Sequence, residues 1–167
     1  MVMKKIQLIN DDFQGHVDII RHACRGIVIK DGKVLLSYET KNDKYMIPGG
    51  GVEDGETYAD CCERELLEET GVAVKANDCY LEIEELFENW QHIQHYFVCD
   101  YVEDTGRQNL TEAEIKCGDE PRWMPLDEAL EMFGDYERFH NTAIEDYGLY
   151  RREYNALRIL KDTVIHK

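Results

Sequence analysis

The sequence predicts a single α/β domain, residues 1–167, in which a mixed β-sheet lies between helices. Short apolar segments bounded by turn residues indicate strands, and stretches with apolar residues three and four apart indicate helices. Residues 92–102 are apolar on both faces of a predicted strand, as expected of a sheet that is covered on both sides. The chain length fits one domain of ordinary size that can enclose a small-molecule site.

The first part of the chain reads as strands joined by tight turns. Asp31-Gly32 is a strong two-residue turn signal and predicts a β-hairpin. Pro48-Gly49-Gly50-Gly51 is expected to form a turn in which the backbone comes close to a ligand, because glycine has no Cβ. The predicted strands are residues 4–9, 26–29, 34–36 and 45–47.

An acidic helix is predicted for residues 58–70. Thr57 is the expected N-cap, with Asp60 three residues later, and Gly71 is the expected residue after the helix end. Ala59, Cys62 and Leu66 mark an apolar face that can pack on the sheet.

Three carboxylates crowd the last two turns of this helix: Glu65, Glu68 and Glu69. A helix C-terminus carries partial negative charge, so each carboxylate there costs about 0.3 to 1 kcal/mol, and like-charge pairs add ~0.2 to 0.5 kcal/mol. Divalent cations between the carboxylates would remove the repulsion, and hard oxygen ligands select Mg²⁺, Mn²⁺ or Ca²⁺. The alternative is an exposed charged helix face.

The second part of the chain contains three more predicted strands, a long loop and two helices. Residues 103–120 lack periodicity and are expected to form the loop. The predicted C-terminal helix, about residues 141–165, carries an apolar stripe of Tyr150, Tyr154, Leu157, Leu160 and Val164. The other predicted elements are strands at 80–87, 92–102 and 122–124 and a helix at 127–133.

The composition of the chain argues against several classes of function. A formal charge of −16 argues against a nucleic-acid partner or an acidic membrane surface, since both need a basic face. The six cysteines lack CxxC or Cys/His metal spacing and are expected to be reduced and mostly buried. No apolar run approaches the ~18 residues that span a bilayer, so we expect a cytoplasmic protein.

One segment resembles a known family closely. Gly50, Glu56, Arg64-Glu65-Leu66, Glu68-Glu69 and Gly71-Val72 reproduce without departure the 23-residue signature of the Nudix hydrolases, residues 50–72. The layout of strands and helices over about residues 22–133 is also similar to that family. The resemblance implies a Nudix-like α/β/α sandwich.

The resemblance also implies an enzyme that uses Mg²⁺ or Mn²⁺ to split a pyrophosphate bond in a nucleoside diphosphate linked to another group. By position, it implies that Arg64 and Glu56 orient the ligands through a salt bridge. The implied metal ligands are Gly49, through its carbonyl, and Glu65, Glu68 and Glu69. A further ligand or base is expected from the loop before the Trp123 strand, where Glu120 and Glu114 are preferred to Glu112 and Asp119.

Markers of several Nudix subgroups are missing outside the signature, which leaves nucleoside triphosphates as the first substrate class, as in MutT-like enzymes. ADP-ribose or nucleotide sugars are the alternative. Aromatic side chains can stack on a base, although core packing is an alternative for each of them. The candidates for substrate contact are Arg25, Tyr38, Tyr45, Phe87 and Trp90.

Two rival functions belong to other classes. The fold also hosts an isomerase of isoprenoid diphosphates, which has a modified signature, and nucleotide-sensing modules, which usually have a degraded one. The intact signature here favours hydrolysis. The expected partner is therefore a small nucleotide. The C-terminal helix could cover the sheet, form a homodimer interface or shape the pocket.

Overall fold

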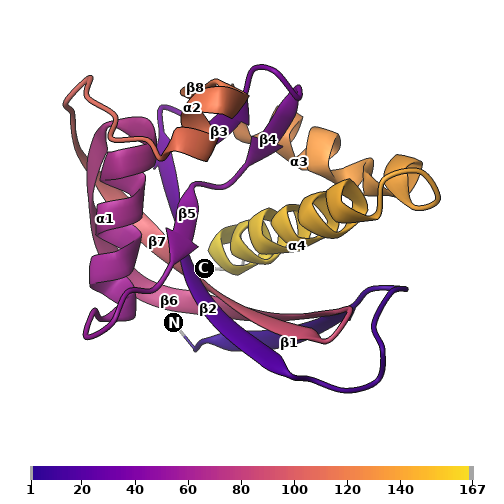
Figure 1. Cartoon of the computed structure of the whole chain (residues 1–167). Helices are drawn as coiled ribbons and strands as arrows, with labels where there is room; N and C mark the ends of the chain where they lie inside the picture. The colour runs from indigo at the N-terminus through magenta and orange to yellow at the C-terminus, as the bar shows by residue number, and fades with distance from the viewer. Residues whose placement is uncertain (1, 166–167) are drawn as a thin grey trace.

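The structure, a computed structural model that describes residues 2–165, is a mixed sheet between two helical layers (Figure 1). The strands are β1 (Lys4–Ile9), β2 (Ile19–Lys30), β3 (Lys33–Glu39), β4 (Lys44–Met46), β5 (Gly49–Gly51), β6 (Val72–Phe87), β7 (Trp90–Asp104) and β8 (Asp119–Pro125). The helices are α1 (Tyr58–Thr70), α2 (Glu112–Cys117), α3 (Leu126–Gly134), the 3₁₀ turn η1 (Tyr136–Phe139) and α4 (Ile144–Ile165).

The strand order is β1-β6-β7-β2-β3-β4, with β5 paired to β2 and β8 paired to β3. The β1–β6 and β2–β7 pairs are parallel, whereas β6–β7 is antiparallel. The sheet is therefore mixed, and the predicted fold class is confirmed.

Each face of the sheet has its own apolar core. On one face, Cys62 and Leu66 of α1 pack with Phe97 and Cys99 of β7. On the other face, α3 and α4 supply side chains such as Phe133 and Leu157, which are fully buried. Alternate residues of β7 pack in the two cores, because successive side chains on a strand point to opposite faces of the sheet.

The β2–β3 hairpin turns where the sequence predicts. Asp31 and Gly32 have φ of 52° and 74°, the left-handed backbone that a two-residue turn needs to match the strand twist. The predicted helix at 58–70 is also confirmed. Both long strands of the second hairpin, β6 and β7, extend beyond their predicted bounds.

Two segments that were predicted to be irregular contain regular secondary structure, so these predictions are wrong in part. Residues 49–51 form a short strand, since Gly49, Gly50 and Gly51 pair with Arg25, Cys24 and Ala23 of β2. Within residues 103–120, β7 continues to Asp104 and α2 forms from 112 to 117. Thr111 and Glu114 cap the start of α2 reciprocally.

The C-terminal helix begins at Ile144 instead of 141 and lies along the sheet face opposite α1 (Figure 1). Tyr150, Leu157 and Leu160 of the predicted stripe are buried, but Val164 is 61% exposed. Over residues 2–165, no helix combines the length and apolarity needed to cross a membrane.

Candidate metal centre

Helix α1 ends where its acidic face meets the sheet. The Thr57 hydroxyl accepts a hydrogen bond from the Asp60 amide at 3.1 Å, so the predicted N-cap is confirmed. Gly71 adopts φ 75° and donates its amide to the Leu67 carbonyl, as a C-terminal glycine should. Glu65, Glu68 and Glu69 thus lie in the last two turns.

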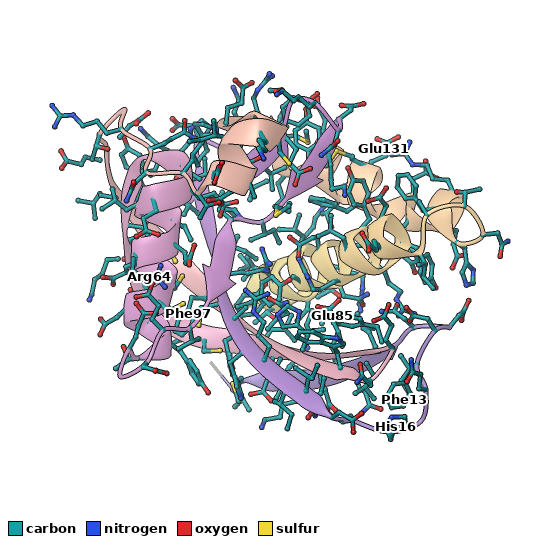
Figure 2. All side chains as sticks on the ribbon, in the orientation of Figure 1. Phe13, His16, Arg64, Glu85, Phe97 and Glu131 are labelled. Atoms are coloured by element: carbon teal, nitrogen blue, oxygen red, sulfur yellow. The ribbon has the colours of Figure 1, made fainter. Side chains whose placement is uncertain are left out.

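Arg64, which Figure 2 labels on α1, pairs with several acidic side chains. Its Nε and Nη2 donate to Glu56 at 2.6 and 2.9 Å, and its Nη1 donates to Glu65 at 2.9 Å and to Glu68 at 3.2 Å. The guanidinium lowers the pKa of the Glu56 carboxyl to about 2. Arg64 therefore orients two of the three crowded carboxylates, and Glu56 holds Arg64.

Glu69 is buried, with 3% of its surface exposed. Its carboxylate accepts a hydrogen bond from the Gly49 amide at 2.9 Å, which brings Gly49 next to the acidic helix. Burial raises the pKa of Glu69 to about 8, against a partial opposing effect of the Gly49 amide and the Arg25 charge. A nearby cation would therefore stabilise the charged form of this buried carboxyl.

The glycines of β5 permit this close approach. A Cβ on Gly50 would lie 2.5 Å from the carboxyl carbon of Glu65, closer than real contacts allow. The backbone can come this near to the carboxylates only because the side chain is absent.

Two acids from the segment before β8 complete a cluster with Glu69. Carboxylate oxygens of Glu69, Glu114 and Asp119 all lie within 4.8 Å of one another. Asp119 is 7% exposed, and its Oδ1 has no hydrogen-bond partner among the described residues. Burial raises the pKa of Asp119 to about 6, and the negative charges of Glu39 and Glu114 act in the same direction. An all-oxygen donor set with an unpartnered buried oxygen fits a hard divalent cation.

The acids of the predicted loop separate into two groups. Glu114 and Asp119 face Glu69, whereas Glu120 accepts a hydrogen bond from Arg122 at 2.7 Å on the exposed side of β8. Alternation along the strand sends Asp119 inward and Glu120 outward. Glu112 is exposed at the start of α2. The structure brings Glu114, but not Glu120, to the helix carboxylates.

The predicted substrate contacts do not share one pocket. Arg25 is buried beside Gly49, where it donates to the Gln94 side chain and to the Ile47 carbonyl, both at 2.8 Å. Tyr38 and Tyr45 stack on each other with ring centroids 4.3 Å apart, on neighbouring strands.

Phe87 and Trp90 line a cavity of about 400 Å³ between the β6–β7 hairpin and α4. Their rings are nearly parallel, with an interplanar angle of 4°. Buried nitrogens of two other lining residues, Nη2 of Arg152 and Nε2 of His92, have no hydrogen-bond partner among the described residues. The cavity therefore offers aromatic surface together with free polar groups, which suits a planar ligand with acceptor atoms.

A buried polar chain joins this cavity to the strand beside the carboxylates. Gln94, which binds Arg25, also donates to Glu85 at 3.2 Å, and Arg152 donates to Glu85 at 3.1 Å. Figure 2 shows Glu85 between the sheet and α4. No sequence pattern singled out Arg152 or Glu85. A usable signal was Glu153, which lies on the apolar face of α4 three residues after Tyr150 and is fully buried.

Comparison with known proteins gives one family. The model of the NUDIX domain matches residues 20–147. An RNA pyrophosphohydrolase of Dinoroseobacter shibae is 43% identical over 56 residues, 31% of this chain and 35% of its own length. An ADP-ribose pyrophosphatase of Methanocaldococcus jannaschii is 44% identical over 57 residues, 32% and 33% of the two chains. The chain thus spans about a third of the length of these curated relatives.

Solved structures share the fold at low sequence identity. A NUDIX hydrolase from Nitrosomonas europaea superposes with a TM-score of 0.59 at 23% identity, over 76% of this chain and 87% of its own. A UDP-X diphosphatase gives 0.60 at 15% identity, over 92% and 67% of the two chains. These similarities support the fold alone.

Proposed function

The chain belongs to the Nudix hydrolase family, and we propose that it hydrolyses a pyrophosphate bond of a nucleoside diphosphate linked to another group, with Mg²⁺ or Mn²⁺ as cofactor. The observation that carries this proposal is the cluster of Glu69, Glu114 and Asp119 beside Glu65 and Glu68. So many carboxylates in one half-buried place repel one another unless cations are bound.

A bound divalent cation neutralises phosphoryl charge and lowers the pKa of a water. Side chains and backbone amides of the protein orient the carboxylates. Arg64 fixes the direction of Glu65 and Glu68, and the Gly49 amide fixes Glu69. Glu114 accepts the proton of the attacking water, since it lies at the cluster and a general base must be within hydrogen-bond reach.

For the substrate, nucleoside triphosphates remain the first candidates and ADP-ribose-like nucleotides the second. The name of one relative supports the second class. The M. jannaschii relative bears the name of an ADP-ribose pyrophosphatase.

An RNA substrate fits less well, although one relative bears that name. A net charge of −16 opposes a polyanion, because RNA binding draws on basic side chains that contact phosphates. A small nucleotide reaches the cluster without contacting much of this acidic surface.

A nucleotide panel tests the proposal. The purified protein is incubated with triphosphates, ADP-ribose, nucleotide sugars and a 5′-triphosphorylated RNA, each with Mg²⁺, Mn²⁺ or EDTA, and the products are separated by anion-exchange chromatography. We expect metal-dependent release of nucleoside monophosphate. Faster turnover of ADP-ribose than of any triphosphate, giving AMP and ribose 5-phosphate, would select the second class. Nucleotide binding without turnover of any compound would favour a sensing module.

A further inference from the structure

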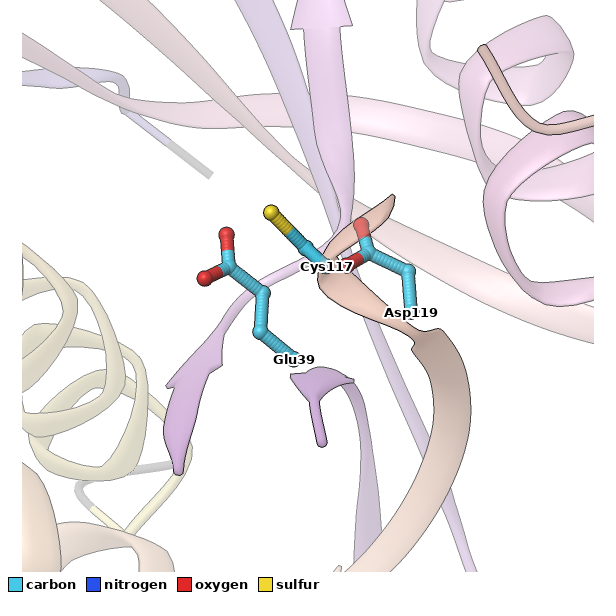
Figure 3. A group of neighbouring side chains, drawn as sticks. All are labelled: Glu39, Cys117 and Asp119. Atoms are coloured by element: carbon cyan, nitrogen blue, oxygen red, sulfur yellow. The ribbon is translucent and has the colours of Figure 1, made fainter. Parts of the chain in front are cut away.

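A second group of potential metal ligands lies beside the carboxylate cluster and contains a thiol. Glu39 at the end of β3, Cys117 at the end of α2 and Asp119 at the start of β8 place one ligand atom each within 4.8 Å of the others. Figure 3 shows the three side chains converging. Asp119 belongs to both groups, so the two share one carboxylate.

The backbone around this group is firmly held. Glu39 and Asp119 are direct partners in the antiparallel β3–β8 pair. The Lys41 amide donates to the Cys117 carbonyl at 3.1 Å, and a Cβ on Gly118 would lie 2.1 Å from the Thr40 hydroxyl. Only glycine therefore lets the end of α2 pack against the end of β3, which places Cys117 over Glu39.

One of the three side chains has an oxygen that is free to bind a ligand. Asp119 is 7% exposed, and its Oδ1 lacks a hydrogen-bond partner among the described residues. Leaving such an oxygen unpaired destabilises the folded chain unless something binds it. Asn42 donates to Glu39 at 2.7 Å and to the Cys117 sulfur at 3.7 Å, so it holds both.

The donor set indicates which cation this group would take. We propose that Glu39, Cys117 and Asp119 form a three-ligand site for Zn²⁺ that shares Asp119 with the all-oxygen site. A thiolate favours a borderline-soft cation over Mg²⁺, and Zn²⁺ accepts mixed sulfur and oxygen ligands with a fourth position left for water. Zn–S bonds of about 2.3 Å and Zn–O bonds of about 2.1 Å place ligand atoms nearer to one another than the 4.8 Å limit, so small side-chain movements would complete the coordination. The Cys117 proton leaves to solvent when the metal binds.

Cobalt substitution tests this proposal without any activity assay. The reduced protein is titrated with Co²⁺ in the presence of excess Mg²⁺, and the thiolate-to-cobalt charge-transfer absorption is recorded. We expect a band that saturates at one equivalent and is abolished by one equivalent of Zn²⁺. Cys117→Ser should remove the band, whereas Cys79→Ser, which alters another half-buried thiol, should keep it.

Glu39→Gln provides a second variant that keeps the thiol. It should keep the band but weaken Co²⁺ binding at least about tenfold, because one of three ligands is lost. Circular dichroism checks that each variant is folded. Absence of the band in the wild-type protein, its persistence in Cys117→Ser, or unchanged affinity in Glu39→Gln would overturn the proposal. Because the readout is spectroscopic, failure here is separable from failure of the proposed hydrolase activity.

Discussion

The buried carboxyl of Glu69 makes the stability of the metal-free protein depend on pH. In the folded protein burial raises its pKa to about 8 from the ordinary value of 4.5. Between these values the folded chain keeps a proton that the unfolded chain has released. Stability from this group is therefore complete below about pH 4.5 and is lost as the pH rises towards 8.

Glu69→Gln removes that proton equilibrium and keeps the shape of the side chain. One proton is worth up to about 1.4 kcal/mol for each pH unit, so from pH 5.5 to 7.5 the wild type should lose about 2 to 3 kcal/mol relative to the variant. In EDTA, Glu69→Gln should thus become the more stable protein as the pH rises. With Mg²⁺ the advantage should shrink or reverse, because the cation stabilises only the ionised carboxyl.

Urea unfolding at several pH values, followed by circular dichroism, measures the difference. Contributions of distant groups cancel when the wild type and the variant are compared at each pH. Glu68→Gln is the matched control, because it removes a neighbouring carboxylate that is 36% exposed and paired with Arg64. A wild-type minus Glu69→Gln difference that does not change with pH, or that changes in the opposite direction, would refute the assignment of Glu69 as a buried, protonated carboxyl.

Three further variants probe the cluster. Arg64→Ala should weaken metal binding about 10- to 100-fold and lower the free energy of unfolding by about 1 to 3 kcal/mol, because Glu56 and Glu65 lose their common partner. Titration calorimetry measures the metal affinity, and urea unfolding measures the stability. Glu68→Gln should leave the melting temperature in EDTA unchanged or slightly higher while abolishing Mg²⁺-dependent turnover, since the loss of one like charge relieves repulsion. Gly50→Ala should weaken metal binding at least about tenfold and leave the metal-free fold intact, because the new Cβ displaces the flexible end of Glu65. Titration calorimetry measures the metal affinity, and circular dichroism checks the fold.

Each of these variants has an outcome that contradicts its reasoning. Wild-type metal affinity in Arg64→Ala would mean that Arg64 does not orient the ligands. A large fall in the metal-free melting temperature of Glu68→Gln would make Glu68 a structural partner. Unfolded Gly50→Ala would mean that the backbone, and not Glu65, yields to the added methyl.

Local sequence signals predicted the parts of the fold that local physics determines. Asp31-Gly32 and Gly71 occupy positive φ, and Thr57 caps α1, so each residue type is explained by its own backbone. The acidic helix was predicted with its correct bounds because both of its ends carry such signals.

The segment before β8 was harder to predict because tertiary pairing decides its structure. Asp119 faces inward only because β8 pairs with β3 in a register that opposes it to Glu39. A one-residue shift would have turned Glu120 inward instead, and a single sequence does not reveal the register. The preference for Glu120 and Glu114 therefore included one acid that faces the cluster and one that does not.

The cavity and its polar chain were not predicted at all. Arg152 reaches Glu85 across 67 positions of the sequence, and no periodic pattern signals such a pair. The sequence offers Phe87 and Trp90 as aromatic candidates, but their joint position beside Arg152 depends on how α4 lies across the sheet.

In the proposed function, the carboxylate cluster supports hydrolysis of a phosphoanhydride by water. Running the nucleotide panel in ¹⁸O-water with Mg²⁺, with Mn²⁺ and with EDTA, and analysing the products by mass spectrometry, tests it most directly. We expect one ¹⁸O atom in a phosphoryl group of a product, only when a divalent cation is present. Release of unlabelled products, or equal labelling in EDTA, would contradict it.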